Sequence, residues 1–198
     1  VITGNWGPDL ALLVRAARDA GLTANFYTYY GGVIGTPTAV GPAGENRMRM
    51  VAYWHPNITP DYPGEKLYQD FKKRFGEEFY AVATYSALTL LADAMKRTKS
   101  TDPLRVAYAM EGAKWAGLTG DIEMRAADHQ LLQPLWIVSW TKVGGPNKND
   151  IEKTGYTWKT EVSYPTYVAS QPTSCTMKRP TRVPASSVVR MNSASNMI

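Results

Sequence analysis

The first thirty residues constrain the fold most, because a short extended segment, an amphipathic helix and a second extended segment follow one another within them. Residues 1–2 lead into a turn, and Pro8 and Asp9 are residue types favoured in the first turn of a helix. Apolar residues then recur at helical spacing up to Gly21, and the segment 24–30 is rich in strand-forming residues. This order predicts half of a doubly wound α/β unit.

The stretch FYTYYGGVIG, residues 26–35, brings tyrosines and glycines together where the second strand is expected to end. Two interpretations are open: the strand finishes in an ordinary turn, or its end presents aromatic faces to a small molecule. Tyr29 and Tyr30 are adjacent, so at most one side chain is expected to face a cleft while the other packs in the core. Tyr85 and Trp115, further along the chain, are both expected to serve packing.

The remaining pattern mixes helices and strands. A Gly/Pro-rich loop with a possible short helix precedes a strand at 48–54, and the proline-rich stretch 55–64 is a break. The other expected elements are helices at 67–75, 80–98 and 102–112, a short strand within 118–130, a buried strand at 134–140 and a strand within 156–168. After Pro180 the tail has no usable period, and we expect it to be loosely held.

The composition is that of an ordinary globular protein. The chain has 198 residues, of which 44% are apolar and 20% charged, and its net charge is +5. The basic clusters at 72–74 and 178–180 are short, whereas a nucleic-acid surface usually needs a denser basic face with aromatic residues beside it. We therefore expect no nucleic-acid partner. No apolar run approaches the ~20 residues of a membrane span.

Residues that carry enzymatic chemistry are scarce. His55 and His129 lie in expected loops without a spacing partner for zinc, and we expect both to be exposed. The single cysteine, Cys175, lacks the basic neighbours or helix start that would activate a thiol. Glu77 and Glu78 are adjacent and point in different directions, which indicates a solvated face rather than an acid–base pair. The sequence predicts no catalytic residue, no metal site and no cofactor.

Five stretches, in this order and spacing, resemble one known family. They are VITGNWGPDLALLVRAARDAGL, ANFYTYYGG, YAVATYSALTLLADAMKRT, GLTGDIEMRAADHQ and SCTMKRP. Together they resemble the substrate-binding proteins of branched-chain amino acid ABC transporters, which are type I periplasmic binding proteins of the leucine/isoleucine/valine-binding kind. The resemblance covers about residues 1–180 and matches only the C-terminal half of such a protein. A start in mid-strand agrees with a fragment from which an earlier part, including a signal peptide, has been removed.

The resemblance implies an α/β fold with parts of two doubly wound lobes that are joined by hinge strands. In the implied division, residues 1–50 are the later part of the second lobe, 51–56 are a hinge crossing, and 57–134 are the returning part of the first lobe. Residues 135–180 are the last crossing and the C-terminal segment on the second lobe. Residues 181–198 are a loosely ordered tail. A few residues at a hinge absorb the rotation of the lobes. In such a fold the ligand lies in the cleft between the lobes, at the carboxyl ends of strands.

The resemblance also implies a set of ligand-binding residues. Trp6 follows the first strand, where the family often has an aromatic residue that contacts the ligand. Tyr30 falls where amino-acid binders carry a glutamate for the ammonium group, and its neighbours Tyr29 and Gly31 belong to the same strand end. Tyr80 matches an aromatic residue at the start of a first-lobe helix that touches the ligand side chain.

The phenol of Tyr30 carries no charge near neutral pH, although a carboxylate is expected at this position. A buried ammonium group without an anionic partner is costly. Either the anion comes from elsewhere, or the ligand is not an α-amino acid. We favour the second outcome, because an aromatic acid, an amide or another small organic solute would suit several aromatic side chains.

The implied function is that of a non-enzymatic solute receptor of an ABC importer, located in the periplasm or held outside the cell by a lipid anchor. Its partners would be a small organic solute, the membrane permease, and either the absent N-terminal half or a second copy. Two alternatives remain open. One is a ligand-sensing regulatory domain of the same fold; the other is a nucleotide-using α/β enzyme that binds phosphate at GGVIG, residues 31–35, although no acid or base follows before Glu45.

Overall fold

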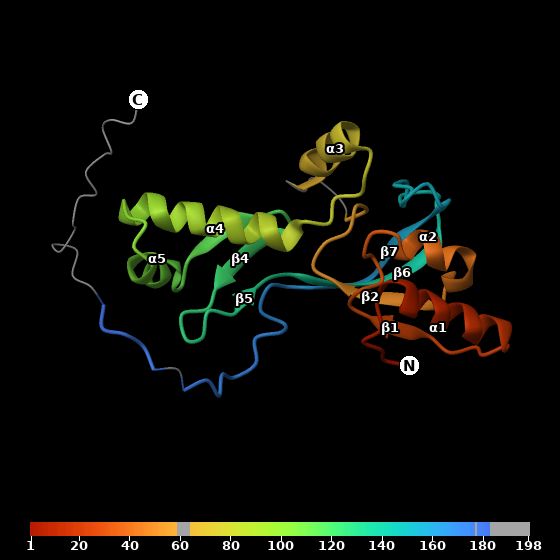
Figure 1. Cartoon of the computed structure of the whole chain (residues 1–198), viewed down its shortest axis with the longest axis horizontal. Helices are drawn as coiled ribbons and strands as arrows, with labels where there is room; N and C mark the ends of the chain where they lie inside the picture. The colour runs from red at the N-terminus through yellow and green to blue at the C-terminus, as the bar shows by residue number, and fades with distance from the viewer. Residues whose placement is uncertain (59–63, 177, 183–198) are drawn as a thin grey trace, which may run out of the picture.

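The protein is described by a computed structural model that covers residues 1–58, 64–176 and 178–182. Along the chain the elements are α1 (Gly7–Asp19), β1 (Phe26–Thr28), α2 (Thr36–Val40), the 3-10 helix η1 (Gly41–Gly44), β2 (Met48–Ala52), α3 (Gly64–Phe75), α4 (Val82–Thr98), α5 (Pro103–Met110), β3 (Lys114–Gly117), β4 (Gly120–Met124), β5 (Leu131–Leu132), β6 (Leu135–Lys142) and β7 (Tyr156–Tyr164). In Figure 1 these elements gather in two groups, one around α1, α2 and the strands β1, β2, β6 and β7, the other around α4, α5 and β4. Within the described residues, no helix combines the length and apolar character needed to cross a membrane.

The expected strand–helix–strand order at the N-terminus is confirmed. Ile2 forms a parallel bridge with Tyr27, and α1 lies between these two extended segments. Pro8 lies in the first turn of α1 and Asp9 supplies the expected acidic residue there. Gly21 follows the helix end with φ +70°, a backbone conformation that glycine adopts without steric cost.

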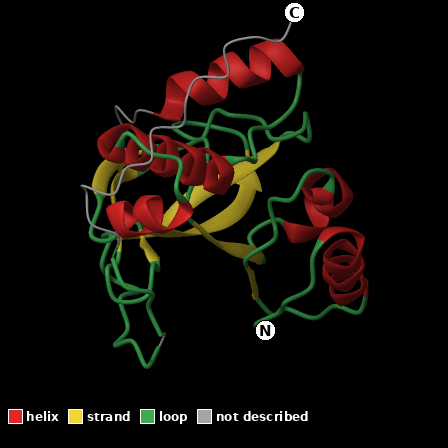
Figure 2. Cartoon of the chain, turned by 60° about the vertical axis from the view of Figure 1, so that its left-hand side comes forward, coloured by secondary structure: helices red, strands yellow, loops and turns green. Residues whose placement is uncertain are grey.

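The first sheet has the strand order β1-β2-β6-β7. β1 and β2 are parallel, whereas β6 is antiparallel to both β2 and β7. The ladder between β6 and β7 shifts register between Ile137 and Val138, which marks a bulge that increases the local twist. Figure 2 shows the strands in the middle of the molecule with helices on both sides of them, as expected for an α/β protein.

The core of this group is centred on Trp140, which is completely buried. The Trp140 indole ring stacks on Tyr156 at 5.7 Å and contacts Trp158 at 4.9 Å between ring centroids. Its Nε1–H donates a hydrogen bond of 2.8 Å to the Gly41 carbonyl. The same side chain therefore contributes apolar packing and satisfies a buried donor, which joins β6 to the turn after α2.

The second group contains the short antiparallel sheet β3-β4-β5 with α4 and α5 beside it. The start of α5 follows the expected signal: the Asp102 side chain accepts a hydrogen bond of 2.9 Å from the Arg105 amide, with Pro103 at the first helical position. A smaller apolar cluster consists of Tyr68 on α3, Phe79 and Val82 at the start of α4, and Leu118 after β3.

Several sequence expectations differ from the structure. β1 ends at Thr28, so Tyr29 and Tyr30 follow the strand and are 67% and 51% exposed; the expectation that one of them packs in the core is wrong. α4 begins at Val82, two residues after the expected start. Tyr85 lies on an open face of α4 and is 38% exposed, whereas Trp115 is partly buried as a packing residue would be. Most of the expected loose tail, residues 183–198, lies outside the described residues.

Candidate ligand-binding site

A hollow of about 80 Å³ lies where three segments distant in sequence meet. The first wall consists of two segments. They are the loop after β1, with Tyr29 and Gly32, and residues 50–56, from β2 onward. A second wall comes from the segment 78–82, which leads into α4. Ligand pockets commonly enclose ~300–1,000 Å³, so this hollow has the size of one part of such a pocket.

Tyr80 is the most informative residue of the second wall. Its side chain reaches Gly32 on the facing loop, where an added β-carbon would overlap the Tyr80 hydroxyl. The residue is 42% exposed, but the hydroxyl lies among protein atoms, and loss of water raises the pKa of Tyr80; Tyr53 and the carboxylate of Glu152 raise it further. The Tyr80 phenol is therefore neutral and able to donate a hydrogen bond at physiological pH.

Trp54 and Phe79 make the hollow strongly aromatic. Their rings meet edge to face with centroids 6.0 Å apart, and Trp54 also packs on Tyr68 at 5.3 Å. The Trp54 Nε1–H is buried and has no hydrogen-bond partner among the described residues. A buried donor without a partner is rare in folded proteins.

The structure brings together two of the five sequence-predicted site residues. Tyr29 and Tyr80 line the hollow, whereas Trp6, Tyr30 and Gly31 are outside its lining. The roles of all five residues in ligand binding stay predictions.

Trp6 and Tyr30 nevertheless lie at one edge of the sheet. The Thr28 hydroxyl donates to the Asn5 carbonyl at 3.4 Å and accepts from the Tyr30 amide at 3.1 Å, which ties the loop before α1 to the end of β1. Trp6 is 62% exposed on this edge. Gly31 is buried instead, and a β-carbon there would lie 3.2 Å from the Trp158 ring.

His55 is buried, so its expected exposure in a loop is wrong. Its Nδ1 accepts from the Asn57 amide at 3.3 Å, which leaves the proton on Nε2, 2.8 Å from the Thr160 hydroxyl. Burial lowers the pKa of His55 to about 3, and the ring is neutral near pH 7. The imidazole is covered because His55 and Asn57, at the start of the proline-rich break, lie against β7: the Asn57 side-chain amide donates to the Thr157 hydroxyl at 2.6 Å and to the Trp158 carbonyl at 2.8 Å.

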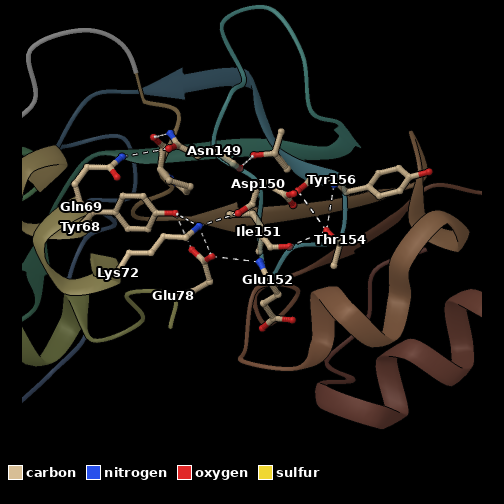
Figure 3. Close-up of polar contacts among 12 residues, drawn as sticks. Tyr68, Gln69, Lys72, Glu78, Asn149, Asp150, Ile151, Glu152, Thr154 and Tyr156 are labelled. Carbon is tan, nitrogen blue, oxygen red and sulfur yellow. Dashed lines mark hydrogen bonds and ion pairs between the residues drawn. The ribbon is translucent and has the colours of Figure 1, made fainter. Parts of the chain in front are cut away.

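Glu78 is likewise not part of a solvated face. Its carboxylate accepts from the Tyr68 hydroxyl at 2.7 Å and from Lys72 Nζ at 2.6 Å (Figure 3). Only 9% of the Glu78 side chain is exposed. The expectation failed because these partners come from α3, on the other side of the turn at Gly76.

The residues that the sequence reasoning missed lie mainly at the end of β2. Tyr53 and Trp54 directly follow this strand, and Gly32 lies one residue after the predicted Gly31. The rule that selected Trp6 and Tyr30, aromatic residues at the carboxyl end of a strand, would also have selected Tyr53 and Trp54. No such signal indicated Ile151 or Trp158, which reach the hollow from distant parts of the sequence.

The hollow offers aromatic surface and hydrogen-bonding groups. Among the described residues that line it, the one carboxylate is that of Glu78, which is already paired with Lys72. Within the part of the chain that the structure describes, no group of three or more His, Cys, Asp or Glu side chains could hold a metal ion. The arrangement is suited to enclosing a small molecule with an apolar or aromatic body.

A family model described as periplasmic binding protein matches residues 1–146. The chain belongs to the periplasmic binding protein family. Its curated relatives include Leu/Ile/Val-binding protein homolog 4 of Brucella abortus, which is 32% identical over 192 residues. That alignment covers 91% of this chain and 44% of the relative, so the chain spans about half the length of the curated relatives it matches.

Solved structures of the family share the fold. A leucine-, isoleucine-, valine-, threonine- and alanine-binding protein from Brucella ovis, in a closed conformation, matches with a TM-score of 0.78 and 29% identity over 91% of this chain and 47% of that one. A solute-binding protein of an ABC transporter from Rhodopseudomonas palustris BisB5, in complex with 3,4-dihydroxybenzoic acid, matches with a TM-score of 0.59 and 19% identity over 80% of this chain and 49% of that one. The second likeness shows the fold alone. The type I periplasmic binding protein fold and the family predicted from the sequence are confirmed.

Proposed function

We propose that this chain forms one side of the ligand-binding cleft of a solute receptor that delivers its ligand to an ABC importer. The observation that carries the proposal is the aromatic hollow, which lies at the end of β2 as binding sites in open α/β sheets do. The family relationship supports a solute-binding, non-enzymatic role. The partner would be the membrane permease, and the compartment the periplasm or the cell exterior under a lipid anchor.

The proposed ligand is a small organic solute with an aromatic or apolar body. The described lining contains no Lys or Arg, and the polar groups that it offers are mainly the hydroxyls of Tyr29, Tyr53 and Tyr80. Both ring nitrogens of His55 are already hydrogen-bonded, to Thr160 and to the Asn57 amide. An aromatic acid or an amide fits these groups better than an α-amino acid does, because the described lining holds no free carboxylate for an ammonium group. One of the two solved relatives is in complex with a benzoic acid and the other is named as an amino-acid-binding protein. The ligand screen therefore includes both aromatic acids and amino acids.

The proposed lobe division follows the sequence expectation. Residues 1–50 and 135–180 would belong to the second lobe, 57–134 to the first, with 51–56 as a hinge crossing. The two groups of elements in Figure 1, with β2 and β6 reaching toward the space between them, support this division as far as residue 164. The segment that follows does not lie on the second lobe: the Thr166 hydroxyl donates to the Asp121 carbonyl at 2.6 Å and the Tyr167 hydroxyl to Glu123 at 2.8 Å, both on β4 of the other group. Ile2 is exposed beside β1, which supports pairing of this edge with the rest of the receptor or with a second copy.

A phosphate-binding role for the glycine loop is not supported. The Gly35 and Thr38 amides at the start of α2 already donate to the carboxylate of Glu152. An anionic phosphate would have to displace this carboxylate. We therefore do not propose the nucleotide-using enzyme, and nothing observed favours a regulatory domain over a receptor.

A thermal-shift screen of the receptor that contains this chain tests the proposal, with L-amino acids, aromatic acids and amides as probes. A ligand at 100 times its Kd should stabilise the protein by about 2.7 kcal/mol, which raises Tm by several degrees. The isolated 198-residue chain, with one side of the cleft, should show a shift below ~1 °C with the same ligand. A screen in which no class stabilises the receptor contradicts the proposal.

A further inference from the structure

Helix α3 contacts both groups of elements, with a different surface on each. The sheet β1-β2-β6-β7 with α1 and α2 is the first group, and the sheet β3-β4-β5 with α4 and α5 is the second. The apolar surface of α3 packs on the second group in one buried cluster. The members of this cluster are Tyr68 and three residues beyond α3, namely Phe79, Val82 and Leu118. The polar surface carries Gln69 and Lys72, which reach residues 149–150 of the first group, in the loop between β6 and β7 (Figure 3).

Lys72 and Glu78 form a shielded ion pair on the second group. Lys72 Nζ lies 2.6 Å from Glu78 Oε1, and the Glu78 side chain is almost fully covered. The Tyr68 hydroxyl donates to the other carboxylate oxygen of Glu78 at 2.7 Å. All three residues come from α3 or from the turn that follows it. The pair is therefore formed within the second group and needs no contact with the first.

This pair makes two hydrogen bonds across the boundary between the groups (Figure 3). Lys72 Nζ donates to the Asp150 carbonyl at 2.8 Å, and Glu78 Oε1 accepts from the Glu152 amide at 3.2 Å. One charged donor and one charged acceptor on the second group thus match an acceptor and a donor on the first. Hydrogen bonds to charged groups are stronger than neutral ones, and a covered pair is screened little by salt.

The loop that receives these bonds is fixed within the first group. Ile151 is buried in the core cluster that contains Trp140, and its amide donates to the Tyr156 carbonyl on β7 at 2.9 Å. The Glu152 carboxylate accepts from the amides at the start of α2, which is also in the first group. Movement of the second group away from the sheet would therefore break its bonds to the loop and leave the loop in place.

The crossing bonds lie directly beside the hollow. Glu78 lines the hollow and precedes Phe79 and Tyr80 of the second wall. Ile151, between the two bonded loop residues, lines the hollow from the first group. Each crossing bond thus joins sequence neighbours of residues that enclose the hollow from the two groups. When these bonds are made, this side of the hollow is closed.

We propose that the Lys72–Glu78 pair is a latch that binds the loop between β6 and β7 and favours the closed arrangement of the two groups. The latch rests on the proposed function, in which closure of the groups around a solute is the binding event. Without the pair, the two loop backbone groups can bond to water instead, so the open arrangement becomes more populated. Residues 51–56 and the packing of Trp54 on the second group stay intact, so the groups remain connected.

Distance measurements between spin labels test this without any ligand. In the receptor that contains this chain, with its cysteines replaced (Cys175→Ser in this chain), labels at Arg15→Cys on α1 and Lys96→Cys on α4 report on the two groups, because both side chains are exposed. We expect mainly the shorter, closed distance for the parent. Replacing Lys72 and Glu78 together by alanine removes both charged crossing bonds and leaves the net charge unchanged. The ratio of open to closed populations should then rise at least about tenfold.

The matched control replaces Lys66 and Asp70 together by alanine. These residues form an ion pair of the same kind on the same helix, but they are exposed and pair with each other. Their loss should leave the distance distribution unchanged. An equal change in this control would show that the effect comes from α3 in general, and it would overturn the latch.

Lys72→Met is the second variant, which serves if the double alanine variant does not fold. It keeps the apolar stem of a partly exposed side chain and removes the bond to the Asp150 carbonyl. The ratio of open to closed populations should rise by about threefold or more. An unchanged distribution in the folded variants overturns the proposal. Because no ligand is added, this outcome is separate from failure of the ligand screen.

Discussion

Replacing Trp140 with alanine is expected to lower the free energy of unfolding by about 3–5 kcal/mol, the range found for removal of large buried aromatic side chains. The indole is fully buried against Tyr156 and Trp158, and its loss also leaves the Gly41 carbonyl without its donor. The cavity would lie where β6 meets the turn after α2, so the first wall of the hollow would lose its support. Urea denaturation of the parent and variant chains measures the effect.

Trp6→Ala is the matched control for this prediction. Trp6 is exposed and makes no side-chain hydrogen bond at the helix start, so its replacement should change the free energy of unfolding by less than about 0.5 kcal/mol. Equal losses in the two variants, or no loss in Trp140→Ala, would contradict the assignment of the core.

Acidification is expected to destabilise the protein through His55. In the unfolded chain this histidine binds a proton below its ordinary pKa of 6.5, whereas in the folded protein burial lowers the pKa to about 3. Between these pH values the unfolded state binds more protons, so stability falls as the pH falls, by up to about 1.4 kcal/mol per pH unit. The full contribution, on the order of 4 kcal/mol, is present above pH 6.5 and is lost on approach to pH 3.

Urea titrations at pH 7, 5 and 4 on the parent and on His55→Gln isolate this contribution. The carboxylates titrate in both proteins, so the difference between their pH slopes reports on His55. The variant should be less stable at pH 7, because it disturbs the contacts to Thr160 and Asn57, but its stability should fall less steeply with acid. Parallel pH dependences for the two proteins would show that the imidazole is not buried in its neutral form.

Local signals in the sequence predicted much of the fold. The start of α1 at Pro8 and the cap of α5 at Asp102 depend on residues within one helical turn, and both are observed. The buried strand at 134–140 was also predictable, because its apolar run is continuous; it forms most of β6. The family could be predicted from the order of five stretches.

Contacts between distant residues could not be predicted in this way. His55 is covered by β7, with a partner at Thr160, and Glu152 meets Gly35, more than a hundred residues earlier. The exposure of both Tyr29 and Tyr30 depends on where pairing with β2 stops, at Thr28. Pairing register, burial and side-chain partners of this kind arise from tertiary structure and leave little trace in local spacing.

The central claim, that Tyr80 is part of a wall of a solute site, is tested most directly by the dissociation constant of the best ligand from the screen. Tyr80→Ala should weaken binding of that ligand to the receptor at least about tenfold, because it removes an aromatic face and a hydroxyl donor from the hollow. Tyr85→Ala, on the exposed face of α4, should leave the constant unchanged. Equal affinities of Tyr80→Ala and the parent receptor, measured by calorimetry, would contradict the account.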